Sequence, residues 1–419
     1  MTFTSPTSAR DAALRRVELA SIGFNVAEWA TWVAMLVYAY QRGGALASSA
    51  VAIVQLVPAA LVAPIGASLA DRYPRARMLT ISYVAQAVTM AATAIALQLD
   101  APTPLVYVLA ACAASSITLT RPAQNGLVPT LARAPESLTR ANAMLSTIEN
   151  ASIVAGPALA GVLLSSGGAG LVFALMTIWV GLSAILVSGV RIATTGAAPP
   201  ESGEDQRNAL RVLASEPRSL LLVALLALQQ LQVGALDVLF VALALNTLAI
   251  GETGVGLLSS AVGLGGVVGA IAAGAIARGS LPRWMAIGSL VWGAGLMLVA
   301  PSTQTVVVFA LVIAAGAGRG LMDVSGRTLL QRTAPPQILS RAFGVLEGLT
   351  MAALAIGAAL AAFLVDRFGP AGAVAAVGAI LPIAVFATLR PLLRADAGAD
   401  ATDAPLATSA EAARVLRRG

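Results

Sequence analysis

Two acidic residues lie near the middle of long apolar segments, where a charge is costly. Glu28 lies near the centre of residues 17–40, and Asp237 lies near the middle of residues 219–245. Ionisable side chains inside membrane segments are rare and usually functional, and a carboxyl group shielded from water can load and release a proton near neutral pH. We predict a proton-coupling role for both, although either could instead bind a cationic substrate or pair with a polar neighbour. The polar candidates at similar depth are Asn25, Gln229 and Gln232.

A second group of charged residues lies nearer one end of the apolar segments. Arg319, Asp323 and Arg327 are spaced four apart, so on a helix they share one face and can pair. With Glu149 and Glu347, these residues are predicted to form a gate network on the cytoplasmic side. The alternative is that they snorkel to the membrane interface and pair at the surface.

The composition excludes several kinds of chemistry. The chain has no histidine, which excludes histidine-based catalysis and histidine metal sites, and all 26 of its basic residues are arginines. Without lysine there is no phosphate-binding loop for ATP, because that motif requires a lysine. We therefore expect no enzymatic activity, no cofactor and no metal.

The hydropathy of the chain indicates an all-α polytopic membrane protein. Of the 419 residues, 58% are hydrophobic and 11% are charged, with a mean hydropathy of +0.84, whereas soluble domains carry roughly 25% charged residues. Apolar runs of about 20 residues match the ~30 Å hydrocarbon core as helices, and they lack the strict alternation of barrel strands. Twelve spans are predicted at 17–40, 48–70, 78–99, 104–122, 141–165, 169–190, 219–245, 254–277, 282–300, 304–326, 341–365 and 371–390.

The arginines fix the predicted orientation and the division of the chain. When Arg121 and Arg319 are counted with the cytoplasmic loops that adjoin them, only Arg42 and Arg367 fall outside the termini and the loops that follow even-numbered spans. By the positive-inside rule, both termini are cytoplasmic, and this charge is not expected to bind nucleic acid. The predicted parts are a cytoplasmic N-terminus (1–16), two six-helix halves (17–190 and 219–393), a central linker (191–218) and a disordered cytoplasmic tail (394–419).

The two predicted halves contain an internal repeat. Pro135, followed by Arg140-Ala141 and Gly156, recurs 201 positions later as Pro336, followed by Arg341-Ala342 and Gly357. Parallel repeats of this kind, separated by a basic central loop, build one known class of secondary transporters.

Three short motifs carry a resemblance to a known family. The first is Leu-Ala-Asp71-Arg72-Tyr-Pro-Arg75 after the second predicted span. The second is Gly156-Pro157-Ala-Leu-Ala-Gly161 in the fifth. The third is Arg121-Pro122-Ala-Gln-Asn-Gly-Leu-Val-Pro129, with Arg121 expected at the cytoplasmic end of the fourth. These segments resemble the major facilitator superfamily and, within it, its drug and siderophore exporters.

The resemblance implies roles for several of these residues. Asp71, with Arg72, Arg75 and Arg121, would belong to the inner gate, where the Asp71 carboxylate caps the helix that begins near Arg341. The Gly-Pro segment would be the exporter motif, for which ordinary packing of small residues is the alternative.

Together these observations predict a secondary exporter of hydrophobic or amphipathic small molecules that is coupled to protons. We expect it to be a monomer in the cell membrane, in contact with lipid. The rival hypotheses are a substrate:proton uptake symporter and a membrane sensor or scaffold that transports nothing.

The arginine distribution gives a testable topology. A reporter that is active only outside the cytoplasm should be inactive when fused to the C-terminus and active when inserted at residues 251–253, which the count places outside. An active C-terminal fusion would contradict the predicted orientation.

Overall fold

The computed structural model describes residues 6–132, 135–190, 216–275, 280–302, 304–333 and 336–397, and every regular element in these ranges is a helix. Most of the predicted linker therefore lies outside the described residues, as do residues 398–419 of the predicted tail.

Three of the helices are hairpins that reverse direction at glycines. They are α1 (Pro6–Arg72), α5 (Pro135–Ser188) and α11 (Pro336–Ala387). The reversals occur at Gly44, Gly168 and Gly369, whose φ angles are 63°, 66° and 68°. This left-handed backbone is strained for residues with a side chain and open to glycine. Each hairpin therefore supplies two of the expected spans.

The remaining spans are single helices or pairs of short helices. They are α2 (Arg75–Gln98), α3 (Thr103–Ile117) with α4 (Thr120–Leu131), α7 (Pro217–Ala242) with η1 (Leu243–Thr247), α8 (Gly251–Ala275), α9 (Leu281–Met297) and α10 (Thr305–Thr333). With the three hairpins, the described residues provide twelve spans.

Two expectations about element boundaries are wrong. The fourth span does not end at residue 122, because α4 continues the path of α3 to Leu131 after a two-residue break. Arg121 therefore lies within the span. The expected disordered tail does not begin at residue 394, because the short helix α12 (Leu389–Ala397) extends to Ala397.

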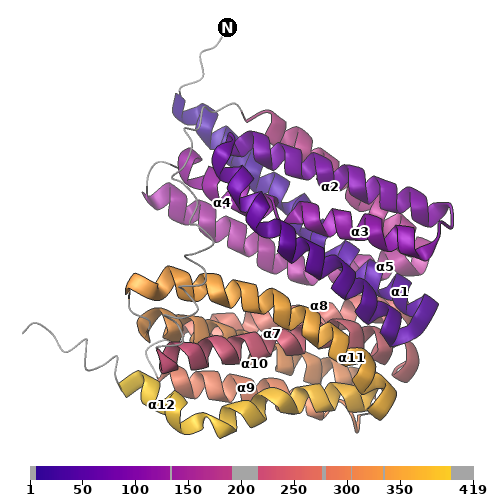
Figure 1. Ribbon diagram of the computed structural model, residues 1–419, viewed down its shortest axis with the longest axis vertical. Helices are drawn as coiled ribbons and strands as arrows, with labels where there is room; N and C mark the ends of the chain where they lie inside the picture. The colour runs from indigo at the N-terminus through magenta and orange to yellow at the C-terminus, as the bar shows by residue number, and fades with distance from the viewer. Residues whose placement is uncertain are drawn as a thin grey trace, which may run out of the picture.

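Figure 1 shows two stacked bundles, with α1 to α5 in the upper one and α7 to α12 in the lower one. The 201-residue repeat is visible in equivalent contacts: a methyl group on Gly156 would lie 2.6 Å from Trp29 Cβ in α1, and one on Gly357 would lie 1.9 Å from the Leu231 carbonyl oxygen in α7. Helices without side chains at such points approach closely, as is usual in membranes.

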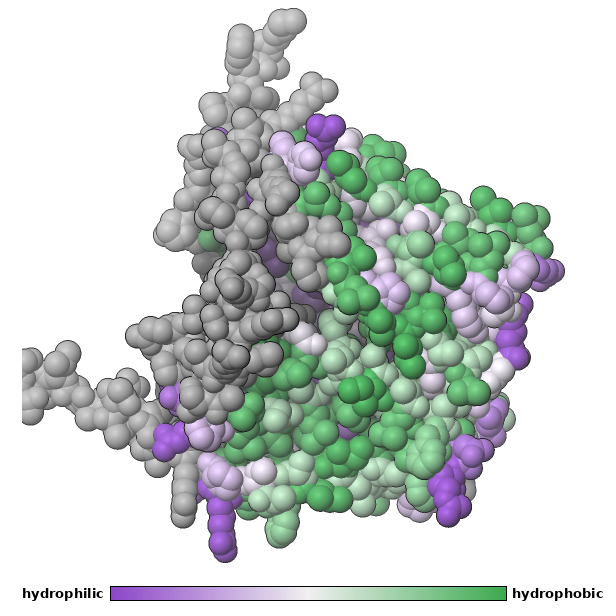
Figure 2. Space-filling view, viewed as in Figure 1, coloured by the Kyte–Doolittle hydropathy of each residue, from purple (hydrophilic) through white to green (hydrophobic). Residues whose placement is uncertain are grey.

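The outer surface is apolar, as expected of a protein in lipid. Leu61, Val306 and Phe386 are 72%, 80% and 79% exposed, and Figure 2 shows hydrophobic residues covering much of the visible face. Eight helices, or helices joined end to end, in the described ranges are long and apolar enough to cross a membrane, and the three hairpins among them can cross it twice. The remaining one of the twelve spans is α9, which is shorter, at 17 residues. The fold is therefore all-α and polytopic, as predicted.

The two halves meet near the end of the bundle that carries the glycine reversals, which we call the glycine-turn end; the opposite end is the arginine-rich end. Tyr40 accepts a hydrogen bond from Asn246, and the Thr253 hydroxyl donates to the Gly161 carbonyl at 3.3 Å. A methyl group on Gly256 in α8 would lie 2.1 Å from the Pro157 carbonyl oxygen in α5. The contact between these helices is therefore a contact of backbones.

This close approach predicts the effect of enlarging Gly256. Gly256→Leu should push α5 and α8 apart and so expose position 253 to water. A cysteine placed at position 253 should then react faster with a water-soluble maleimide, by about tenfold if the equilibrium between the closed and the open contact shifts by ~1.4 kcal/mol. The measurement uses purified protein in which Cys112, the single cysteine, is alanine. Gly274→Leu, in the same helix, is the matched control, because a methyl group added at that position would meet nothing within 4 Å. Equal labelling of the two variants would refute the assignment.

Candidate functional site

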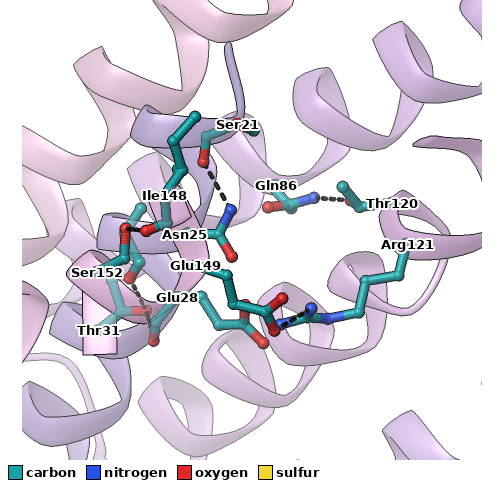
Figure 3. Close-up of polar contacts among 11 residues, drawn as sticks. Ser21, Asn25, Glu28, Thr31, Gln86, Thr120, Arg121, Ile148, Glu149 and Ser152 are labelled. Carbon is teal, nitrogen blue, oxygen red and sulfur yellow. Dashed lines mark hydrogen bonds and ion pairs between the residues drawn. The ribbon is translucent and has the colours of Figure 1, made fainter. Parts of the chain in front are cut away.

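The charged centre of the N-terminal half is an arginine shared by two carboxylates. The Arg121 guanidinium lies 3.0 Å from a Glu28 oxygen and 2.8 Å from a Glu149 oxygen. Figure 3 shows the three side chains converging from α4, α1 and α5. One positive charge thus meets two negative ones, and the cluster has a net charge of −1 when both carboxyl groups are ionised. We call these three residues the Arg121 cluster.

The Arg121 cluster borders a cavity of about 220 Å³, which we call the polar cavity. Its side chains include Asn25, Gln124, Asn125 and Asn142 beside Arg121 and Glu149. Asn25 donates to the Ser21 carbonyl at 2.7 Å, and its buried amide oxygen has no hydrogen-bond partner among the described residues. The Arg121 and Glu149 side chains are 44% and 45% exposed, so water or a ligand can reach them.

The second predicted carboxylate lies in a different place. Asp237 of α7 accepts a hydrogen bond from the Trp32 indole of α1 at 3.0 Å, across the boundary between the halves. Both residues line a smaller cavity of about 50 Å³, the aromatic cavity, together with Trp29, Phe240, Trp292 and Arg319. Four aromatic residues from α1, α7 and α9 thus lie together around this cavity.

The two cavities follow one another along the same helix faces. Asn25, Trp29 and Trp32 are spaced by three or four residues on α1, as are Glu149, Ile153 and Pro157 on α5. Such spacing puts the residues on one face, and seven residues of helix correspond to roughly 10 Å. A molecule entering from the arginine-rich end would pass the polar cavity before reaching the aromatic one.

The two glutamines expected near Asp237 have structural contacts. Gln229 donates its amide to the Arg319 carbonyl at 3.0 Å and so ties α7 to α10. Gln232 accepts from the Trp292 indole at 2.8 Å and donates to the Val377 carbonyl of α11. Both glutamine side chains are fully buried in the C-terminal half.

The residues predicted to form one gate network are divided between several locations. Glu149 joins the Arg121 cluster and Arg319 lines the aromatic cavity, whereas Arg327 pairs with Asp323 at 3.1 Å, as their spacing predicted. The side chains of Glu347, Asp71 and Arg72 lie outside the described part, although their backbones are in α11 and α1. Arg75 donates to the Gly126 carbonyl of α4, within its own half.

The Gly-Pro segment of α5 contacts two different helices. Gly156 lies against Trp29 of α1, while Pro157 and Gly161 face Gly256 and Thr253 of α8. The segment therefore joins the N-terminal half to the C-terminal half beside the aromatic cavity.

Sequence reasoning missed a buried network on α2 and α4. Gln86 donates to the Thr120 hydroxyl at 2.7 Å and to the Ser82 hydroxyl at 3.1 Å. Polar residues at i and i+4 in an apolar span were the available signal, because buried polar groups need partners. Through this network, α2 holds the first turn of α4, which carries Arg121.

The charge balance of the Arg121 cluster gives a test of its structural role. Arg121→Gln should lower the melting temperature of the purified protein by a few degrees and by more than Glu149→Gln, because it leaves two carboxylates without a counter-charge. Adding Glu28→Gln and Glu149→Gln to Arg121→Gln should restore most of the loss. Arg332→Gln, at an exposed position in the last turn of α10, is the control, and an Arg121→Gln variant as stable as that control would contradict the cluster.

The chain resembles known proteins in sequence and in fold. The family model described as Major Facilitator Superfamily matches residues 18–240 and again residues 222–418. An uncharacterized MFS-type transporter, y4rN of Sinorhizobium fredii, is 28% identical over 324 residues, which cover 74% of this chain and 78% of that protein.

Solved structures share the fold at low sequence identity. The nucleoside transporter NupG superposes with a TM-score of 0.72 at 14% identity, covering 90% of this chain and 98% of that one. A bacterial homologue of the iron transporter ferroportin, in an inward-facing state, superposes with a TM-score of 0.68 at 17% identity, covering 91% of this chain and 99% of that one.

Proposed function

This chain belongs to the Major Facilitator Superfamily, and from that premise we propose that it exports hydrophobic or amphipathic small molecules, of the drug or siderophore type, in exchange for protons. The observation that carries the proposal is the Arg121 cluster, in which one guanidinium holds two carboxylates inside the membrane protein, and Arg121 and Glu149 line a cavity. Carboxylates are the acid–base groups that the chain can offer for this task, because it has neither histidine nor lysine.

The proposed mechanism is alternating access by a monomer in the cell membrane. The arginine bias supports a cytoplasmic arginine-rich end. The backbone contact between α5 and α8 and the Tyr40–Asn246 hydrogen bond lie toward the opposite end. On this orientation the present state is closed toward the outside, and the polar cavity is reached from the cytoplasm.

The Arg121 cluster provides a means of coupling. A guanidinium within 3.0 Å stabilises the ionised form of Glu28 relative to the same group without it. In the inward-facing state this contact favours release of protons to the cytoplasm. In the outward-facing state, movement of α1 or α5 away from Arg121 would favour their uptake.

Glu28 is the proposed main carrier, and Asp237 has a lesser or substrate-specific role. Glu28 contacts the guanidinium directly and has a side chain 24% exposed. Asp237 is instead held by Trp32 at the boundary between the halves, where its charge would influence the substrate more than the proton.

Substitution of Glu28 tests the coupling. In reconstituted vesicles, Glu28→Gln should abolish proton-driven transport of a panel of amphipathic dyes of positive, negative and zero charge, while dye binding survives. Asp237→Asn should have a smaller effect. Glu18→Gln is the control, because it makes the same change on α1 ten residues before Glu28 and outside both cavities.

The direction in which the dye is transported distinguishes the rival functions. Dye accumulation in everted vesicles that requires an inward-acid gradient supports export. Accumulation in right-side-out vesicles indicates uptake, and the absence of any flux indicates a sensor. Persistence of proton exchange in both neutralised variants would move the coupling to another group.

A further inference from the structure

Arg319 is an arginine in the middle of a membrane helix. None of its side-chain nitrogens lies within 4 Å of a carboxylate oxygen in the described ranges, although Asp323 and Asp237 attract it from farther away. It is the fifteenth of the 29 residues of α10, and it lines the aromatic cavity. The other arginines with assigned contacts differ from it: Arg121 is paired with two carboxylates, and Arg327 with Asp323. A guanidinium has five N–H donors and no acceptor. Those of Arg319 are therefore available to a ligand or to water.

A second unused donor belongs to a residue that lines the same cavity. The indole nitrogen of Trp29 is buried and has no hydrogen-bond partner among the described residues. Buried N–H groups of tryptophan usually find a partner. Trp32, by contrast, donates to Asp237. The aromatic cavity thus holds unsatisfied donors on α1 and α10, and one carboxylate that already accepts a hydrogen bond.

The rest of the aromatic cavity is apolar. Its walls include Trp292, Phe240, Val262 and Leu236. A guanidinium beside aromatic and aliphatic walls interacts more strongly with an opposite charge than it would in water, because the local dielectric is low. Planar bidentate binding of carboxylate-like groups is the property that distinguishes arginine from lysine.

We propose that the aromatic cavity binds the anionic head group of an amphipathic organic anion, a carboxylate or a sulfonate, through Arg319 and the Trp29 N–H. The proposal rests on the proposed transport function and names its substrate class. A cavity of about 50 Å³ suits such a head group rather than a whole organic molecule. The body of the ligand extends along the shared face of α1 and α5 toward the polar cavity.

A cationic ligand fits this cavity less well. It would face the positive charge of Arg319, and an oxygen of Asp237, the cavity's single carboxylate, is already taken by the Trp32 indole. When Asp237 is ionised it balances Arg319, and when it is neutral the cavity has a net positive charge. In neither case is the cavity net negative, so the charge balance favours an anion.

Three ligands that share one ring system test the proposal by calorimetric titration of the purified protein in lipid nanodiscs. Naphthalene-2-sulfonate should bind more tightly than the uncharged naphthalene-2-sulfonamide, and 2-naphthylmethylammonium should bind weakest. Arg319→Gln should weaken sulfonate binding by about tenfold or more and leave the sulfonamide nearly unchanged, because charge-assisted hydrogen bonds exceed neutral ones by that order. Trp29→Phe, which keeps the ring and deletes the donor, should weaken sulfonate binding roughly three- to tenfold.

Two further variants serve as controls in the same titrations. Arg332→Gln makes the same change on α10 outside both cavities, and should alter neither affinity. Arg319→Lys should keep the preference for the anion with lower affinity, which provides a second variant should Arg319→Gln fold poorly. Equal binding of sulfonate and sulfonamide, preference for the ammonium, unchanged sulfonate affinity in Arg319→Gln or no sulfonate binding at millimolar concentration would each overturn the proposal. Because the titration needs no gradient, a failure of proton coupling or of export would leave this result intact, and the reverse also holds.

Discussion

A charge within a bilayer needs an opposite charge, a hydrogen-bond partner or water, and this requirement governs the interior of the protein. Arg121 meets it with Glu28 and Glu149, which brings α4 to α1 and α5 in one half. Trp32 meets it for Asp237 across the boundary between the halves. Because lipid can replace none of these partners, each contact fixes a helix in place, and a movement that separates α1 from α7 must provide Asp237 with a new partner.

The two intramembrane arginines satisfy this requirement differently. Arg121 is held by residues of its own half and lies beside a cavity with amide walls. Arg319 faces a cavity with indole walls, and none of its nitrogens lies within 4 Å of a carboxylate oxygen of the described chain. In the proposed mechanism, the site for protons is thus separate from the site for a larger molecule, and both lie along one continuous face of α1 and α5. Such a separation lets the two events influence each other through helix movement rather than through competition for the same atoms.

The fold follows from the sequence because it is set by features that a local reading detects: apolar length, glycine reversals and the 201-residue repeat. The depth of Arg121 in its span does not follow from the sequence in this way. Arg121, Gln124 and Asn125 resemble a cytoplasmic loop by hydropathy, yet α4 continues through them, and their side chains line the polar cavity. Hydropathy along the chain cannot distinguish a residue facing water from one facing a polar cavity. Likewise, the spacing of Arg319, Asp323 and Arg327 predicted the second pair, but only the packing of α7 against α10 places Arg319 beside Asp237.

The backbone contact between α5 and α8 has a consequence for the energetics of movement. Where Gly256 approaches Pro157 and Gly161, there are no long side chains to interlock and few rotamers to order. Separating such surfaces costs mainly dispersion contacts, each of which is small. Such a contact is specific in geometry, but few side chains have to be reordered when the two helices separate. A transporter that must visit both the joined and the separated form on every cycle works fastest when neither is a deep minimum.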